Sequence, residues 1–169
     1  MSLPGGISSW SLLSVCLLFD GVVLHIVGLA TPEWSTSNVV GISYSAGLWK
    51  GCADGYCVEY PQTTAALEAC EAMAIIGMFF SLFAITAVGI LLVCKITGIL
   101  AVSSAHHIAA ALSIISFVFI LIGIIVWGAE VHASNSNFKI GYSFILSIVG
   151  GVLIAIGGIM YSCSMTNVG

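Results

Sequence analysis

The sequence predicts an all-α membrane protein, a four-helix bundle, because the chain is strongly apolar and its apolar residues fall into four long runs. Of its 169 residues, 60% are apolar and 6% are charged, and the mean hydropathy is +1.18. A soluble globular domain carries about 25% charged residues. A helix crosses a hydrocarbon core of about 30 Å with about 20 apolar residues. The composition therefore excludes an ordinary soluble protein.

The four apolar runs define the expected membrane spans, near Ser11–Ala30, Ala69–Cys94, Ala105–Ala129 and Ile140–Cys163. The first run is short, like the core of a secretory signal, but no basic segment precedes it and it contains Asp20 and His25. We therefore interpret it as a retained span. Glycine and serine are frequent in the runs and predict closely packed helices, because small residues let transmembrane backbones approach each other.

Polar segments between the runs are expected to form a large first loop near residues 31–68 and a second loop on the same side near residues 130–139. We expect the chain, residues 1–169, to be a single domain. Strand-like pieces of the first loop, rich in β-branched and aromatic residues or next to a turn signal, are Asn38–Tyr44, Ala46–Cys52 and Cys57–Tyr60. The second helix is expected to begin after Pro61, with Thr63 or Thr64 as its N-cap.

Two cysteines and two tryptophans stand out in the first loop. Cys52 and Cys57 are separated by four residues that include Asp54-Gly55, which fits a short hairpin with a disulfide across its strands. Trp34 and Trp49 lie just outside an apolar run, where an indole ring prefers the membrane interface and is half-buried.

Trp34, the triplet Gly47-Leu48-Trp49 and the two cysteines resemble the W…GLW…C…C signature of the claudin/PMP22/EMP/MP20 superfamily. The later motif Gly-Tyr-Ser-Phe-Ile-Leu, residues 141–146, is similar to the start of the fourth span in PMP22, epithelial membrane proteins and lens MP20. The resemblance implies an all-α membrane four-helix bundle with a small extracellular antiparallel β-sheet. It also implies a multi-pass protein of the plasma membrane with both termini in the cytoplasm. Glu71 departs from the pattern, since many claudins carry a basic residue there.

Charge says little about orientation, because the chain has no arginine and only three lysines, Lys50, Lys95 and Lys139. With cytoplasmic termini, Lys95 lies inside and the other two lie outside, so charge counting alone favours the reverse orientation. A Cys52–Cys57 disulfide needs an oxidising compartment. We therefore place the first loop outside the cell.

The first loop is acidic, with four carboxylates against one lysine and a formal charge of −3 between residues 31 and 69. Two interpretations remain open. In the one that we favour, these groups are solvated loop charges. In the other, Asp54 and Glu59 line a cation-selective paracellular path, which requires that the acids converge after assembly.

Asp20 and His25 lie inside the first span, where ionisable groups are costly. They are five residues apart, about 140° around a helix, and so do not share a face. A proton or ion relay is one hypothesis. We favour the other, in which Asp20 is protonated or hydrogen-bonded in the bundle and His25 reaches the outer interface.

The remaining cysteines divide by position. Cys94 and Cys163 lie at the inner ends of the second and fourth spans, where thiols are open to S-palmitoylation. Cys16 and Cys70 are expected to be small buried apolar side chains.

No catalytic motif is present: the sequence has no H-E-x-x-H, G-x-S-x-G or P-loop, and Cys52 and Cys57 do not form a C-x-x-C. His106 and His107 are expected at the membrane interface rather than at a metal, because adjacent helical residues point in different directions. We therefore expect no enzyme, no cofactor and no metal site.

The resemblance implies a claudin-like membrane interaction protein that acts in cell adhesion or in a paracellular barrier, at cell junctions such as the tight junction. It would associate laterally in one membrane and in trans with the neighbouring cell. Stargazin-like and calcium-channel gamma subunits resemble the same fold, so an auxiliary subunit of an ion channel is the alternative. The expected partners are membrane lipid, further copies of the chain or other membrane proteins, including a channel subunit, and no nucleic acid.

Overall fold

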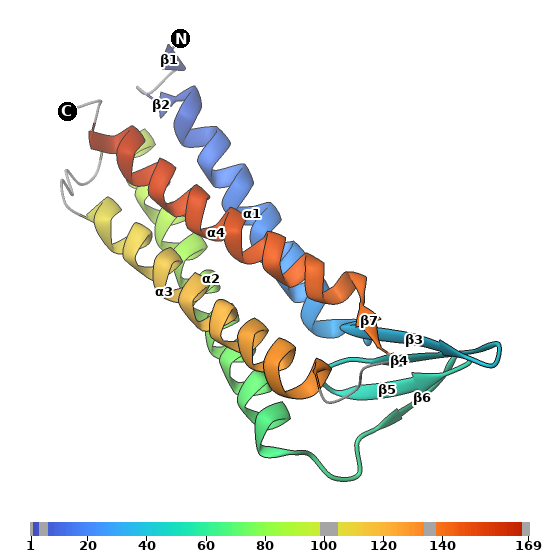
Figure 1. The fold of residues 1–169 in the computed structure, drawn as a ribbon. Coiled ribbons are helices and arrows are strands. Elements are labelled where there is room, and N and C mark those ends of the chain that lie inside the picture. Colours follow the sequence, from blue (N-terminus) through green and yellow to red (C-terminus); the bar gives the residue numbers. More distant parts are fainter. Residues whose placement is uncertain (1, 4–6, 99–104, 134–137, 167–169) are drawn as a thin grey trace.

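A computed structural model describes residues 2–3, 7–98, 105–133 and 138–166. In chain order, the elements are the strands β1 (Ser2–Leu3) and β2 (Ile7–Ser8), helix α1 (Ser9–Ala30), the strands β3 (Ser35–Val39), β4 (Ile42–Ala46), β5 (Lys50–Ala53) and β6 (Tyr56–Glu59), the helices α2 (Ala65–Thr97) and α3 (Ala105–Val126), the π-helical turn η1 (Trp127–His132), strand β7 (Lys139–Ile140) and helix α4 (Tyr142–Thr166). The helices form one bundle, and β3 to β7 project from one end of it, which we call the sheet end (Figure 1). The predicted fold class is confirmed.

The four helices are each long and apolar enough to cross a membrane. The longest is α2, whose 33 residues extend over about 50 Å, more than a hydrocarbon core requires. It begins four residues before the predicted span, because the Thr64 side chain caps it by accepting a hydrogen bond from the Leu67 backbone N–H at 3.2 Å. It ends at Gly98, which has a positive φ of 67°.

The third helix ends differently from the prediction. Its α-helical part stops at Val126, and the chain continues as a π-helical turn to His132 before the second loop. The predicted second loop falls partly outside the described residues, because residues 134–137 are not among them. Its last part forms β7, which joins the sheet.

Helices α1 and α4 pack along a row of small residues on each helix. The rows repeat every seven residues: Ser14, Gly21 and Gly28 on α1, and Ser143, Gly150, Gly157 and Ser164 on α4. All seven are buried. Lipid tails are as apolar as leucine, so close backbone packing rather than a hydrophobic force holds such helices together.

The approach of the two backbones is close enough to exclude any side chain. A Cβ added at Gly150 would lie 2.7 Å from the Gly21 carbonyl oxygen and 2.8 Å from the His25 backbone nitrogen. The pair α2 and α3 packs in a similar way at Gly77, whose carbonyl oxygen accepts a hydrogen bond from Ser116 Oγ at 2.7 Å.

We expect Gly150→Leu to prevent α1 and α4 from packing. The new side chain would overlap backbone atoms, which no change of rotamer can move, and the expected loss is about 3 kcal/mol or more. Thermal unfolding in detergent, followed by size-exclusion fluorescence, measures the effect. Gly89→Leu is the matched control, because an added Cβ at this exposed position has no heavy atom within 4 Å. Equal midpoints for the two variants would contradict the packing argument.

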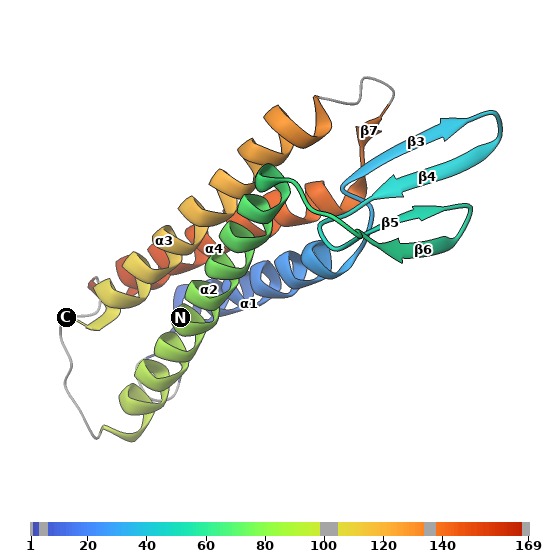
Figure 2. The same ribbon diagram turned by 90° about the horizontal axis from the view of Figure 1, so that it is seen from below.

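The sheet has the strand order β6-β5-β4-β3-β7 and is antiparallel throughout. Two hairpins supply four of its strands, and both project beyond the helix ends (Figures 1 and 2). Each turn has two residues with positive φ, Val40-Gly41 in one hairpin and Asp54-Gly55 in the other. This is the turn whose twist matches that of the flanking strands.

Two of the three strands predicted in the first loop do not form as predicted. The piece Asn38–Tyr44 contains the turn at Val40-Gly41 and is split between β3 and β4. Valine favours strands, and its presence in the turn concealed the turn signal of Gly41. The piece Ala46–Cys52 is interrupted as well, because residues 47–49 form a loop between β4 and β5.

The polar residues of the first span are also placed differently from the prediction. His25 is buried and its Nε2 lies 3.2 Å from the Ala74 carbonyl oxygen of α2, so it does not reach the interface. Asp20 faces away from the bundle. Cys16 is exposed rather than buried, whereas Cys70 is buried as expected. In lipid, apolar composition does not show which side of a helix faces inward.

Candidate functional site

The end of α1 is capped by the two tryptophans of the sequence signature. The last four carbonyl groups of a helix have no partner within the helix. Here the Gly28 carbonyl accepts a hydrogen bond from Trp34 Nε1 at 2.8 Å, and the Leu29 carbonyl accepts one from Trp49 Nε1 at 2.7 Å. The signature therefore joins the sheet to the helix through backbone groups.

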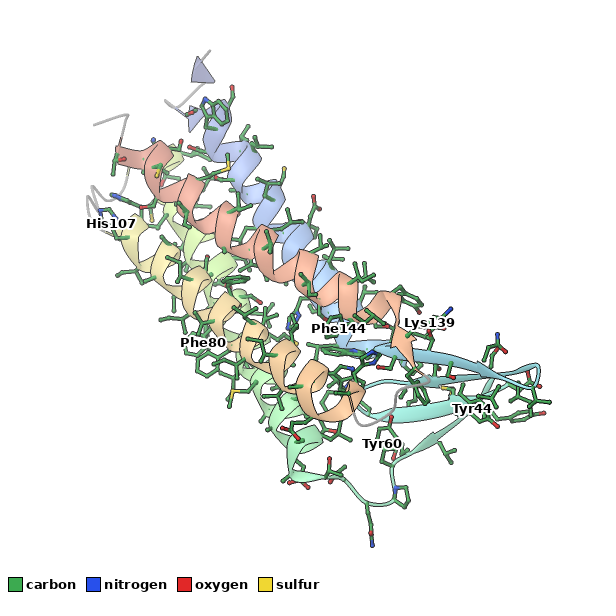
Figure 3. All side chains as sticks on the ribbon, viewed as in Figure 1. Tyr44, Tyr60, Phe80, His107, Lys139 and Phe144 are labelled. Carbon is green, nitrogen blue, oxygen red and sulfur yellow. A yellow bond between two sulfur atoms is a disulfide. The ribbon has the colours of Figure 1, made fainter. Side chains whose placement is uncertain are left out.

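The Trp34 ring forms the centre of this connection, in contact with two other helices. Its centroid lies 5.2 Å from that of Trp127 and 5.7 Å from that of Phe144. Trp34 is only 1% exposed, so the prediction of a half-buried interfacial ring is wrong for this residue. Trp49 is 38% exposed, in agreement with it. Figure 3 shows Phe144 where the bundle meets the sheet.

The loop that contains the signature triplet packs tightly against the start of the first loop. A Cβ added at Gly47 would lie 2.5 Å from Pro32 Cα, so only glycine fits. Leu48 is fully buried. The Tyr60 hydroxyl donates a hydrogen bond to the Gly47 carbonyl at 3.0 Å. Burial raises the pKa of Tyr60, so this hydroxyl keeps the proton that it donates.

The motif at the start of α4 holds the same segment from the other side. The Gly141 N–H donates to the Trp34 carbonyl at 3.0 Å, and the Ser143 N–H donates to the Glu33 carbonyl at 3.0 Å. The Ser143 hydroxyl in turn accepts the Glu33 N–H at 3.2 Å. A Cβ at Gly141 would overlap the Glu33 carbonyl. Two motifs that lie far apart in the sequence thus form one site.

The contribution of the π-helical turn η1 was not predicted from the sequence. Trp127 Nε1 donates to Ser35 Oγ at 3.2 Å, and His132 Nδ1 lies 2.9 Å from the same oxygen. A tryptophan at the end of the third apolar run was the available signal.

One face of the sheet carries a row of side chains that crosses all five strands, with three polar members followed by the disulfide. Residues paired side by side in the register are Lys139, Thr36, Ser45, Cys52 and Cys57. They line a hollow of about 590 Å³ together with Glu33, Asn38 and Ser43 among others. Lys139 lies at the edge where α4 begins (Figure 3). This face is suited to polar contacts.

The disulfide and the two acids lie in the second hairpin. Cys52 and Cys57 are bonded, and they are direct partners in the register of β5 and β6. Asp54 and Glu59 are both exposed. Asp54 is in the turn, whereas Glu59 pairs with Lys50 across the strands, so its charge has a basic neighbour. The structure of one chain does not bring the two acids together.

Among the described residues, no group of three or more His, Cys, Asp or Glu could hold a metal ion. Four apolar helices, joined by an indole-capped helix end to a disulfide-bearing sheet, define a multi-pass membrane protein of the claudin-like fold. A model of the PMP-22/EMP/MP20/Claudin family matches residues 9–161, and the chain belongs to this family. A comparison with curated proteins found no match.

We expect Trp34→Phe to lower stability by about 1–3 kcal/mol, because the Gly28 carbonyl would stay buried without a donor. Trp49→Phe removes an equivalent hydrogen bond from a half-exposed side chain, where water can replace it, and should cost less. Thermal midpoints in detergent provide the comparison. A larger loss for Trp49→Phe would contradict the role of Trp34 as the buried cap.

Proposed function

We propose that the protein is a claudin-like interaction protein that acts by binding rather than by catalysis, in cell adhesion or in a paracellular barrier. The sheet then faces the neighbouring cell, and both termini lie in the cytoplasm. The Cys52–Cys57 disulfide supports this orientation, because such bonds persist in oxidising compartments. The two chain ends lie at the opposite end of the bundle from the sheet (Figure 1).

The adhesive proposal rests on the exposed apolar residues at the tip of the first hairpin. Val40 is 96% exposed and has a φ of 52°, a costly conformation for a β-branched residue. Its neighbours Val39 and Ile42 are 45% and 41% exposed. A contiguous group of exposed apolar residues is typical of a contact surface, whereas single exposed apolar residues are common. We therefore propose that this tip contacts a protein of the opposing cell.

Lateral association is supported by the free edge of the sheet. Within the part of the chain that the structure describes, strand β6 pairs only with β5, and its four residues are exposed. Tyr56 and Val58 lie on one face of it and are 84% and 74% exposed. An edge strand presents unpaired N–H and C=O groups to a neighbour. We propose this edge as a side-by-side contact in the same membrane.

We expect Val40→Asp to reduce adhesion between cells that express the protein by about tenfold, because a carboxylate at an apolar contact must lose its water. A cell-aggregation assay, with surface labelling to verify equal expression, measures this. Gln62→Asp is the control, because it adds the same charge at an exposed polar position of the same loop, outside the hairpin. Unchanged aggregation with Val40→Asp would remove the tip from the adhesive surface.

The alternative role, as an auxiliary subunit of an ion channel, predicts a different result in copurification. A channel protein that copurifies in fixed stoichiometry after gentle detergent extraction would replace the adhesive proposal. Enrichment at cell contacts without a channel would support it.

If the protein lines a paracellular route, Asp54 is the better candidate for cation preference, because Glu59 has Lys50 opposite it. We expect Asp54→Asn to lower the ratio of Na⁺ to Cl⁻ permeability across a cell layer more than Glu59→Gln does. Exposed charges act over about 8 Å at physiological salt, so Asp54 must lie close to the path. An unchanged ratio in both variants would leave a barrier role without charge selection.

We propose Cys94 and Cys163 as S-palmitoylation sites. Cys94 is half-buried and Cys163 is exposed, both near the end of the bundle opposite the sheet. In the proposed orientation, this end meets the inner leaflet.

A further inference from the structure

Asp20 lies in the middle of α1 and faces away from the bundle. It is the twelfth of the 22 residues of the helix, so both helix ends are at least about 15 Å away. Its side chain is exposed, and within the described residues its carboxyl group has no hydrogen-bond or ion-pair partner. An ionisable group at the bilayer centre almost always faces a partner or a cavity. An aspartate is too short to reach the interface from this depth.

The residues around Asp20 form a regular exposed stripe, which we call the α1 seam: Leu13, Cys16, Asp20, Val23 and Val27. Their spacing alternates between three and four residues, as at the a and d positions of a coiled coil. At about 100° per residue, the seam lies on the side of α1 opposite the fully buried Leu18. Leu13 is 45% exposed, and Val23 and Val27 are each 40% exposed. Among the described residues, no helix of the same chain covers this seam.

We infer that two copies of the chain pair in one membrane through their α1 seams, with the two Asp20 carboxyl groups hydrogen-bonded to each other. Two copies in one membrane share one orientation, so a twofold axis along the membrane normal brings equal positions together at equal depth. A carboxyl group that keeps its proton is both donor and acceptor, and therefore complements itself.

The composition of the seam favours a second copy over other occupants. Cys16 and Val23, on either side of Asp20, have short side chains, which leave the two carboxyl groups room to meet. The chain has no arginine, and Lys50, Lys95 and Lys139 all lie toward the ends of the helices or in the sheet, so copies of this chain offer no cation at the depth of Asp20. A single polar residue at an a position also sets register and oligomeric state.

This contact does not depend on the proposed function. It forms within one membrane and needs no opposing cell, no sheet edge and no hairpin tip. Its failure would leave the adhesive proposal standing, and the reverse also holds.

The first test uses Cys16 as a reporter, because a parallel dimer places the two copies of this residue side by side. The full chain with Cys94→Ala and Cys163→Ala is oxidised in membranes with copper-phenanthroline, and non-reducing gels show any dimer that dithiothreitol reverses. We expect a strong Cys16 cross-link. The matched control moves the thiol by Cys16→Ala with Phe19→Cys, to a position that is 56% exposed but lies off the seam, and should cross-link weakly.

The second test changes Asp20 itself and measures dimerisation by energy transfer between labelled copies as the lipid is diluted. An interhelical hydrogen bond in a membrane corresponds to about a 3- to 30-fold change in association, so Asp20→Leu should weaken the dimer by this factor. Asp20→Asn should stay within about twofold of the original, because an amide is also donor and acceptor. Formation of the Cys52–Cys57 disulfide verifies folding of each variant.

Three results would overturn the inference. Cross-linking at position 19 that equals or exceeds that at position 16 would place the contact elsewhere. Unchanged association of Asp20→Leu would remove the carboxyl group from it. A photo-cross-linker at Val23 that captures a different membrane protein, rather than a second copy, would assign the seam to a foreign helix that carries a basic residue.

Discussion

Two indole N–H groups on the last carbonyls of α1 are the interaction on which the rest of this structure depends. A helix that ends at the membrane surface leaves carbonyl groups without partners, and an unsatisfied group there is costly. Trp34 and Trp49 satisfy the carbonyls of Gly28 and Leu29; Trp34 directly precedes the first hairpin, and Trp49 lies in the loop that joins it to the second. Capping the helix therefore also fixes the base of the sheet, from which the two hairpins project beyond the helix ends (Figure 1).

Close packing of α1 and α4 supports the cap. Gly21 and Gly150 bring the backbones into contact, and this places Gly141 and Ser143 against the chain segment that carries Trp34. The small residues between α1 and α4 and the aromatic residues at the sheet end therefore act together to hold the sheet on the bundle. Stability in the membrane comes from close packing and internal hydrogen bonds, since lipid provides no hydrophobic force between helices. Buried serines contribute such internal hydrogen bonds: Ser116 donates one to the Gly77 carbonyl on the facing helix.

The surfaces left free are different in kind. At the sheet end, the exposed side chains of Val40 in a turn and Tyr56 on a strand are available for contacts outside the membrane. Within the membrane, apolar exposure carries no information, because lipid covers it equally well. The informative residue there is the polar one: Asp20 on the outer side of α1 is the group that lipid cannot satisfy. The protein thus has candidate contacts both above the membrane and within it, and they can act separately.

Much of this protein is determined by its sequence alone. The four spans follow from run length and hydropathy, and the Asp54-Gly55 hairpin follows from local turn chemistry. Resemblance to a known signature identified Trp34 and the triplet at Gly47. Tertiary structure decided what those patterns do not encode: that Trp34 is buried rather than interfacial, that Trp127 joins it, and that His25 faces inward while Asp20 faces out. The physical reason is that helices in lipid are apolar on every side, so the direction of each side chain is set only when the backbones pack.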